Sequence, residues 1–169
     1  QSGGLPRIVK SMVRALDAAG TDLILVETVG VGQTELGIIG VADTVLVAMN
    51  PESGDAIQTL KAGVMEIADI FLVNKADRDG ADQMATAITG MIQMSLTRPR
   101  WSPPVLLTTA HTGQGIEDLW GKIQDHRDFQ TTSGELEERR GTQRKREFLE
   151  AVEEVLAQRL RQKVENDPE

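Results

Sequence analysis

The residues of this sequence best suited to chemistry are Asn74, Lys75 and Asp77, which form the pattern N-K-x-D directly after the apolar run 69–73. A carboxylate such as that of Asp77 can accept two hydrogen bonds from the N1–H and the exocyclic amine of guanine, an arrangement that adenine does not offer. The stem of Lys75 can lie along a flat base, and Asn74 can tie neighbouring loops together. The pattern predicts a guanine-binding loop; the simpler alternative is a polar strand end that closes into a turn at 77–80 (DRDG).

A second polar cluster supports the guanine interpretation. Thr109 ends the apolar run 105–109, and Ala110 and His111 follow it before Gly113. The Thr-Ala pair resembles the S-A-x loop of GTPases, whose backbone N–H groups meet the carbonyl oxygen of guanine. It follows N-K-x-D after one predicted helix, which is the order found in GTPases. Taken alone, the same residues describe an ordinary glycine-containing loop.

A third candidate is an acid at the end of the first apolar run. Glu27 lies near the end of run 22–29 and precedes Gly30. This resembles a Walker B strand leading into a D-x-x-G switch, in which the acid orients Mg²⁺ through water and the glycine N–H approaches a γ-phosphate. Most GTPases have Asp at the position of Glu27, and a partly buried acid bonded to its own loop is the alternative. A dinucleotide fingerprint G-x-G-x-x-G is excluded by Glu35.

One expected motif is missing. The sequence contains no G-x-x-x-x-G-K-[ST] phosphate loop, and its only Gly-Lys pair, Gly121-Lys122, lies in a predicted helix. Such a loop supplies a Lys and a ring of backbone N–H donors to a triphosphate. We therefore expect this chain alone to bind nucleotide weakly and to hydrolyse GTP hardly at all. Because it also begins without Met, we expect it to be part of a longer protein; a processed N-terminus is the alternative.

These polar clusters need a scaffold that brings them to one edge. Four runs rich in Val, Ile and Leu are continuously apolar, as strands of a parallel sheet covered on both faces are: 22–29, 43–49, 69–73 and 105–109. Helical patterns lie between and around them, at 6–19, 53–67, 80–96 and 115–126. This alternation predicts a doubly wound α/β fold, in which ligands bind outside the carboxyl ends of the strands.

The composition limits the class of function. The 169 residues carry 18 Lys and Arg against 26 Asp and Glu, a net charge of −8 that disfavours a general nucleic-acid binder. Cysteine is absent, which excludes disulfides and thiolate metal sites. No apolar run approaches the roughly 18 residues of a membrane span, and the start (QSGGLPRIVK) has no signal-peptide core. We therefore expect a cytoplasmic protein with neither a membrane nor a nucleic-acid partner.

The chain changes character after residue 128. Apolar residues between 148 and 164 recur at helical spacing in a highly charged segment, which predicts an amphipathic helix. The basic stretch 139–146 is expected to be a solvated helix face. His111 and His126 are expected at the surface or as caps, without a catalytic role, and Trp101 as a packed connector.

Three stretches together resemble the ArgK/MeaB family of P-loop GTPases, which belongs to the G3E group and is related to the methylmalonic aciduria type A protein. They are ETVGVGQTE (27–35), NPESGDAIQTLKAGVMEIADIFLVNKADR (50–78) and TTAHTGQG (108–115) followed by LW (119–120). The resemblance covers residues 3–163 and includes Glu27 in place of Asp. It implies a three-layer, mostly parallel P-loop NTPase fold of the SIMIBI type followed by a C-terminal helical extension.

The same resemblance implies a function. Family members are GTP-hydrolysing chaperones of adenosylcobalamin-dependent methylmalonyl-CoA mutase, which gate cofactor delivery and protect the mutase; older names describe lysine/arginine/ornithine transport kinases. Residues 1–128 would be a partial GTPase domain and 129–169 a homodimerisation extension. GTP or GDP and Mg²⁺ would be the cofactors.

Individual residues take roles by position in the family pattern. Glu27 would be the Mg²⁺-associated acid and Gly30 the γ-phosphate sensor. The base would be read by Asn74, Lys75 and Asp77 and by Thr109, Ala110 and His111. Switch residues would be Gln33 and, in the family's additional loop at 50–61, Asp55 and Lys61, although a solvated helix charge is an equal alternative for Lys61.

Two other functions remain open. The chain can be a non-enzymatic module that dimerises and binds a partner without turnover. It can also be a nucleotide-dependent kinase or ATPase linked to lysine, arginine and ornithine transport, although no residue pattern reads an amino acid.

Overall fold

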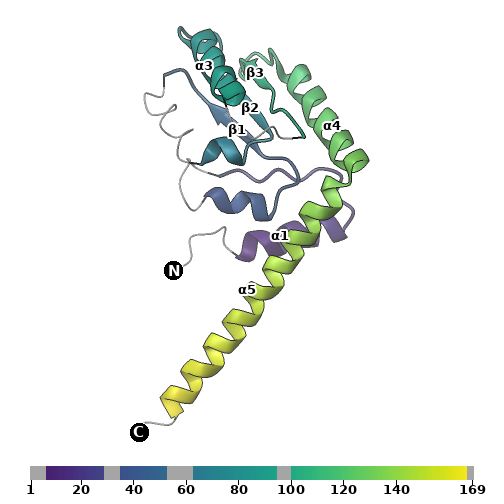
Figure 1. Ribbon diagram of the computed structural model, residues 1–169, viewed down its shortest axis with the longest axis vertical. Coiled ribbons are helices and arrows are strands. Elements are labelled where there is room, and N and C mark those ends of the chain that lie inside the picture. Colours follow the sequence, from purple (N-terminus) through teal and green to yellow (C-terminus); the bar gives the residue numbers. More distant parts are fainter. Residues whose placement is uncertain (1–6, 29–34, 53–62, 95–99, 167–169) are drawn as a thin grey trace.

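The computed structural model describes residues 7–28, 35–52, 63–94 and 100–166. Figure 1 shows the strands gathered at one end of the molecule and a long helix leading away from them to the C-terminus. In chain order the elements are α1 (Arg7–Ala18), the 3-10 helix η1 (Glu35–Gly40), β1 (Leu46–Met49), the 3-10 helix η2 (Val64–Glu66), β2 (Ile70–Asn74), α3 (Ala81–Met94), β3 (Val105–Thr108), α4 (Ile116–Ser133) and α5 (Glu135–Asn166).

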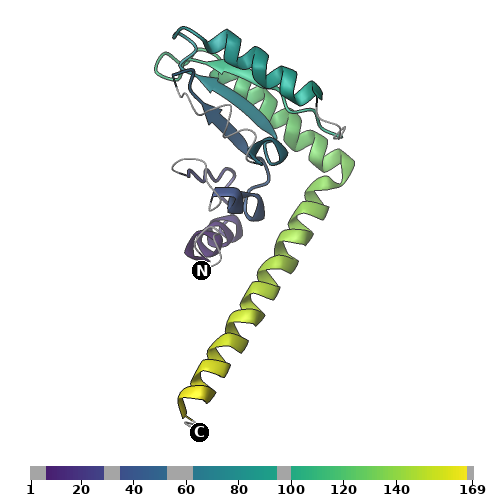
Figure 2. The same ribbon diagram turned by 60° about the vertical axis from the view of Figure 1, so that its left-hand side comes forward.

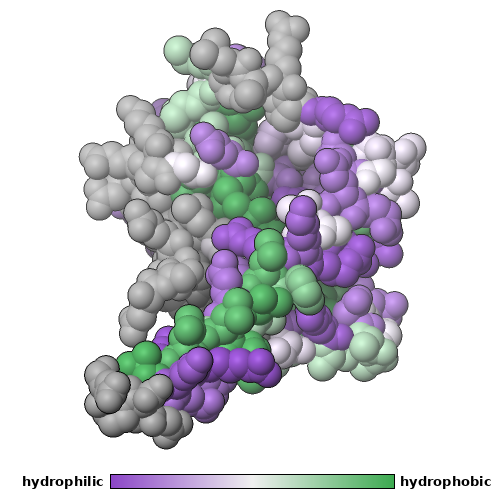
Figure 3. Space-filling model, turned by 60° about the horizontal axis from the view of Figure 1, so that its bottom comes forward, coloured by the Kyte–Doolittle hydropathy of each residue, from purple (hydrophilic) through white to green (hydrophobic). Residues whose placement is uncertain are grey.

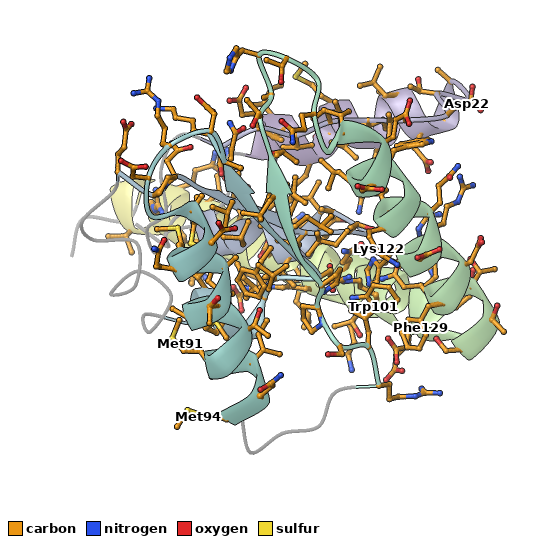
Figure 4. The ribbon with its side chains drawn as sticks, turned by 90° about the horizontal axis from the view of Figure 1, so that it is seen from above. Asp22, Met91, Met94, Trp101, Lys122 and Phe129 are labelled. Carbon is orange, nitrogen blue, oxygen red and sulfur yellow. The ribbon has the colours of Figure 1, made fainter. Side chains whose placement is uncertain are left out.

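The three strands form one parallel sheet in the order β1-β2-β3. The central strand β2 is apolar from Ile70 to Val73, and all four of these residues are buried. Met84 and Ile88 of α3 belong to the same buried cluster as Phe71 and Val73, so α3 covers one face of the sheet. Figure 4 shows α4 on the opposite side of the strands from α3. The parallel α/β architecture predicted from the continuously apolar runs is therefore confirmed.

The prediction of a strand at 22–29 is wrong for the residues that the structure describes. Residues 22–28 form no strand, and Leu23 and Leu25 are 52% and 84% exposed. A β-strand is stable only when a neighbouring strand accepts and donates its backbone hydrogen bonds. In the described residues β1 pairs with β2 alone, and no strand lies between β1 and this run. An apolar run is thus necessary for a buried strand but does not supply its partner.

The two C-terminal helices are separated by a single glycine. α4 continues past the predicted end at 126 to Ser133, because no glycine or proline interrupts residues 127–133. Gly134 then adopts a left-handed conformation, with φ +79°, and starts α5 in a new direction. Figure 2 shows α5 leaving the sheet as a straight arm.

The predicted amphipathic helix is present in α5, and its apolar side chains are exposed. Figure 3 shows them as a continuous apolar band flanked by polar side chains. The helix contacts α1 through the ion pairs Lys10–Glu150, at 2.7 Å, and Arg14–Glu147. The exposed large apolar residues of α5 are Phe148, Leu149, Val152, Val155, Leu156, Leu160 and Val164.

Two arginines fasten the first turns of α5 to the amino-terminal end of the sheet. Arg139 Nη1 donates to the Asp69 carboxylate at 2.9 Å and to the Asp43 carbonyl at 2.5 Å. Arg140 donates to both carboxylate oxygens of Asp43, at 3.0 and 2.7 Å. The expectation that 139–146 is a solvated face is therefore wrong for these two residues. The cause is tertiary: acids that precede β1 and β2 lie against this part of α5.

His126 is buried beside Asp69, whereas a surface or capping position was expected. Only 1% of it is exposed, and its Nδ1 lies 2.9 Å from Thr44 Oγ1 and its Nε2 lies 3.4 Å from Asp69 Oδ1. Burial lowers the pKa of the imidazole below its ordinary value, although the Asp69 carboxylate opposes that shift. Trp101 packs on the His126 imidazole, with the ring centroids 4.9 Å apart, and its Nε1–H donates to the backbone carbonyl of Asp69 at 2.8 Å.

None of the helices in the described part of the chain is both long enough and apolar enough to cross a membrane.

Candidate functional site

The N-K-x-D residues occupy the turn at the carboxyl end of β2. Lys75 adopts a left-handed backbone conformation with φ +57°, which is uncommon for a residue with a side chain. The turn is closed by Arg78 N–H donating to Lys75 O, at 2.9 Å, and is joined to β3 by Ala76 N–H donating to Thr108 O, at 2.9 Å. Strain of this kind persists where surrounding contacts fix the backbone, and it collects at binding sites.

Asn74 connects this turn to the loop after β3. Its Oδ1 accepts hydrogen bonds from Ala110 N–H, at 3.1 Å, and from Thr108 Oγ1–H, at 3.3 Å. Two of the sequence clusters therefore lie side by side at one edge, because parallel pairing sets Asn74 opposite Thr108. A base that met Ala110 N–H through a carbonyl oxygen would share this donor with Asn74.

The loop after β3 is internally hydrogen-bonded. Thr109 is buried, and its N–H donates to Gln114 O at 3.0 Å while its own carbonyl accepts from the Thr112 hydroxyl, also at 3.0 Å. Ala110 and His111 are exposed at the tip. This arrangement presents two adjacent residues to solvent on a loop held by the residues on either side.

Gly115 fixes where this loop enters α4, a role that the sequence analysis missed. Its φ is +78°, and a Cβ built on it would lie 2.3 Å from Leu107 O. The site therefore requires glycine for both conformation and space. The available signal was the pair Gly113 and Gly115 immediately before a helical pattern, a spacing typical of a tight loop-to-helix turn.

Three charged side chains of the N-K-x-D turn, those of Lys75, Asp77 and Arg78, lie close to one another or to a carboxylate from outside the turn. Glu52, from the turn after β1, lies 3.4 Å from Lys75 Nζ and 3.6 Å from Arg78 Nη1. Arg78 Nε lies 3.6 Å from the Asp77 carboxylate. The Asp77 carboxylate is exposed, so a ligand in solvent can reach it. The edge thus combines an accessible acceptor, a lysine stem and hydrogen-bonded backbone loops.

Glu27 is described, and among the hydrogen bonds and ion pairs between described residues none joins it to this network. It is exposed and belongs to the irregular stretch 22–28. Among the described residues, no group of three or more His, Asp or Glu side chains could hold a metal ion. Mg²⁺ commonly takes one or two protein carboxylates and completes its shell with water and phosphate oxygens. A single exposed carboxylate such as that of Glu27 has the chemistry for one such contact, and its role toward Mg²⁺ stays a prediction.

Four predicted site residues lie outside the described residues. They are Gly30, Gln33, Asp55 and Lys61.

Comparison with known proteins places this arrangement in context. A family profile described as "Methylmalonyl Co-A mutase-associated GTPase MeaB" matches residues 1–165. A solved structure described as an LAO/AO transport system kinase superposes with a TM-score of 0.79 at 28% sequence identity, covering 91% of this chain and 50% of that one. The predicted P-loop NTPase-like fold and the ArgK/MeaB resemblance are both confirmed.

Curated relatives of this chain carry names that agree with this family. A Pyrococcus horikoshii protein, named as a GTPase, is 44% identical over 163 residues. The match covers 94% of this chain and 51% of the relative. The Escherichia coli protein named GTPase ArgK is 34% identical, over 83% of this chain and 44% of the relative. The mouse protein named methylmalonic aciduria type A homolog, mitochondrial, is 31% identical, over 85% of this chain and 35% of the relative. The chain thus spans about half, or less, of the length of these relatives.

Proposed function

This chain belongs to the MeaB family of methylmalonyl Co-A mutase-associated GTPases, and from that premise we propose that it carries the guanine-reading half of a GTP-dependent chaperone switch. The observation that supports this most directly is the Asn74 bridge. Its carbonyl oxygen joins the N-K-x-D turn to Ala110, so two loops with the chemistry to read one base lie together at the carboxyl edge of a parallel sheet.

In this proposal the base is read by hydrogen bonding and covered by a lysine stem. Asp77 accepts hydrogen bonds from the N1–H and the exocyclic amine of guanine. Lys75 lies along the ring, and the loop at Thr109, Ala110 and His111 meets the base carbonyl. An adenine base would leave the Asp77 carboxylate facing an acceptor nitrogen, and unpaired polar groups of this kind make such sites selective.

The phosphate side of the switch is the part of the proposal that needs residues this sequence does not contain. Glu27 and Gly30 are proposed to face the γ-phosphate, with Glu27 contacting Mg²⁺ through water; the ion would neutralise phosphate charge. With no phosphate-loop lysine in the sequence, we propose that the chain alone binds guanine nucleotides weakly and does not turn them over.

Two partners complete the proposal. The family description names methylmalonyl Co-A mutase, and we propose an adenosylcobalamin-dependent mutase as the partner whose cofactor loading the switch gates. Gln33, Asp55 and Lys61 are proposed to relay the nucleotide state to it. The exposed apolar band of α5 supports a homodimer through residues 129–169, with 1–128 as the partial GTPase domain.

A base-exchange experiment tests the central proposal. In Asp77→Asn an amide N–H replaces one acceptor, so the site should prefer xanthine, whose C2 oxygen is an acceptor, over guanine. Binding of GDP, XDP and ADP is compared by shifts of backbone amide resonances, which report millimolar affinities. We expect the wild-type chain to respond to GDP and not to ADP, and Asp77→Asn to favour XDP at least tenfold relative to wild type, about 1.4 kcal/mol.

The control is Asp82→Asn, which removes another exposed carboxylate, on the first turn of α3. Unchanged base preference in Asp77→Asn, with a wild-type chain that binds GDP, would contradict the assignment of Asp77.

A further inference from the structure

Glu52 and Arg78 have no role in the base contacts proposed above, yet both lie against the residues that make them. We propose that Arg78 is an internal competitor of the base for the Asp77 carboxylate, and that Glu52 is a positioning residue that draws Arg78 and Lys75 into the base-accepting arrangement. This inference rests on the proposed function, because it requires that Asp77 reads guanine.

The first step is the position of one guanidinium between two carboxylates. Arg78 Nε lies 3.6 Å from Asp77 Oδ2, and Arg78 Nη1 lies 3.6 Å from Glu52 Oε1. Guanidinium is planar, carries five N–H donors and stays protonated at all relevant pH values. The Arg78 side chain can therefore turn toward Asp77 or toward Glu52 and still lie beside a carboxylate. Attraction to one of these acids weakens the attraction of Arg78 to the other.

The second step is competition for the same atoms. A guanine base needs both Asp77 oxygens, one to accept from N1–H and one to accept from the amine. Arg78 Nε already lies 3.6 Å from one of them, Oδ2. Binding therefore requires Arg78 to leave or to share this oxygen. Glu52 lowers the free-energy cost of moving Arg78 away from Asp77, because the guanidinium keeps the Glu52 carboxylate, now 3.6 Å from Nη1, as its ion-pair partner.

The third step concerns the lysine stem. The other Glu52 oxygen, Oε2, accepts from Lys75 Nζ at 3.4 Å, so the same acid holds the ammonium end of the side chain proposed to lie along the base. Lys75 has φ +57°, and its backbone direction is set by the turn. Glu52 comes from the turn after β1 and thus couples two strand ends. Losing Glu52 frees Arg78 to close on Asp77 and frees Lys75, and both changes weaken guanine binding.

The size of the effect follows from exposure. The four side chains are between 41% and 59% exposed, and ion pairs in that setting change equilibria only a few-fold. They are also screened by salt, with a Debye length of about 3 Å at 1 M. The expected effects are therefore small, opposite in sign for the two residues, and lost at high salt.

The experiment measures GDP affinity of the 169-residue chain by amide-resonance titration at low salt and at 1 M salt, with ADP as reference. We expect Glu52→Gln to weaken GDP binding about three-fold and Arg78→Gln to strengthen it about two-fold. The double variant lacks the competing guanidinium but still frees Lys75, so it should bind GDP more tightly than Glu52→Gln and less tightly than Arg78→Gln. These signs oppose simple charge effects on an anionic ligand, since removing an acid should attract GDP and removing a base should repel it.

The Arg78 Nε–H resonance of the nucleotide-free chain reports the partner exchange directly, and we expect it to shift in Glu52→Gln. Glu153→Gln makes the same change in net charge on α5, the helix that leads away from the strands in Figure 1, and should leave GDP affinity unchanged. If wild type binds GDP and the two variants follow the charge signs or do not change, the inference is wrong and the proposed function stands. If wild type does not distinguish GDP from ADP, the proposed function fails and the inference fails with it.

Discussion

At the scale of single residues, position in the fold decides which side chains carry specific demands. Asn74 and Gly115 are both polar-loop residues in the sequence, yet one holds two loops together through Oδ1 and the other leaves no room for a side chain. The N-K-x-D pattern identified the first because its chemistry is recognisable. No chemistry marks the second, because its demand comes from the carbonyl of a neighbouring strand.

Gly115→Ala is expected to destabilise the chain by about 2–4 kcal/mol, because it adds a left-handed alanine and a clash with the Leu107 carbonyl. Urea unfolding followed by circular dichroism measures this. Gly113→Ala is the matched control: its φ is +81°, but no atom lies within 4 Å of the added Cβ. It should cost only about 1–2 kcal/mol. Equal losses would show that the close approach at Gly115 is not tight.

His126 gives a residue-scale prediction in pH. Its pKa is lowered by burial in the folded chain, so below pH 6.5 the unfolded chain binds more protons than the folded one. The contribution of His126 to the unfolding free energy is therefore present above that pH and is lost as pH falls, with a slope of at most about 1.4 kcal/mol per pH unit.

The measurement is urea unfolding at several pH values from 7.5 downward. His126→Gln should lower stability at pH 7.5 but flatten the decline toward acid. The control is His111→Gln, which removes an exposed histidine from the loop after β3. It should leave the loss of stability toward acid unchanged. A His126→Gln profile parallel to wild type would show that another group causes the acid loss.

At the scale of elements, the amino-terminal and carboxyl ends of the sheet have different tasks. The carboxyl end holds the exposed polar loops of the candidate site, whereas the amino-terminal end is the anchor of α5. Asp69 is central to that anchor: its Oδ2 accepts from Val45 N–H at 2.7 Å and from Arg139 at 2.9 Å, and Oδ1 lies beside His126. One carboxylate thus connects the start of β1, α4 and α5.

Arg139→Gln should weaken this anchor by about 1–3 kcal/mol, since it leaves the mostly buried Asp69 carboxylate without its guanidinium partner. Hydrogen exchange should rise first in the initial turns of α5, and urea unfolding gives the free energy. Arg146→Gln is the control, because Arg146 is 68% exposed and forms an ion pair with Glu150 on the same helix. Its expected effect is below about 0.5 kcal/mol. Similar exchange in both variants would exclude Arg139 as the anchor.

At the scale of the whole molecule, the arm and the sheet face solvent in different ways. α5 presents an apolar band along its carboxyl-terminal half, from Phe148 to Val164, and exposed apolar surface of this extent marks interaction sites in soluble proteins. A second copy of the chain is the occupant proposed above.

Leu156→Glu should therefore shift the chain from dimer to monomer at micromolar concentration, because a charge buried in an apolar helix interface is strongly unfavourable. Analytical ultracentrifugation measures the mass. Gln158→Glu adds the same charge on another part of the helix and should leave the mass unchanged. A wild-type chain that is monomeric at high concentration would contradict the proposed dimer.

The sequence by itself determined the parts of this protein whose signals are local. Continuous apolar runs predicted β1, β2 and β3, helical periodicity predicted α3 and α5, and N-K-x-D with the Thr-Ala loop located the edge where polar residues gather. These features depend on backbone propensity, side-chain period and residue chemistry, all of which are written in neighbouring positions.

Tertiary structure decided what depends on a partner distant in the chain. The run 22–28 is an apolar run like the others, but in the described part of the chain no strand pairs with it. The sequence predicted a surface or capping position for His126 and a solvated position for Arg139. In the fold, α4 places His126 and α5 places Arg139 beside Asp69. Backbone pairing, burial and charge compensation each need a second group, and only the fold brings that group within reach.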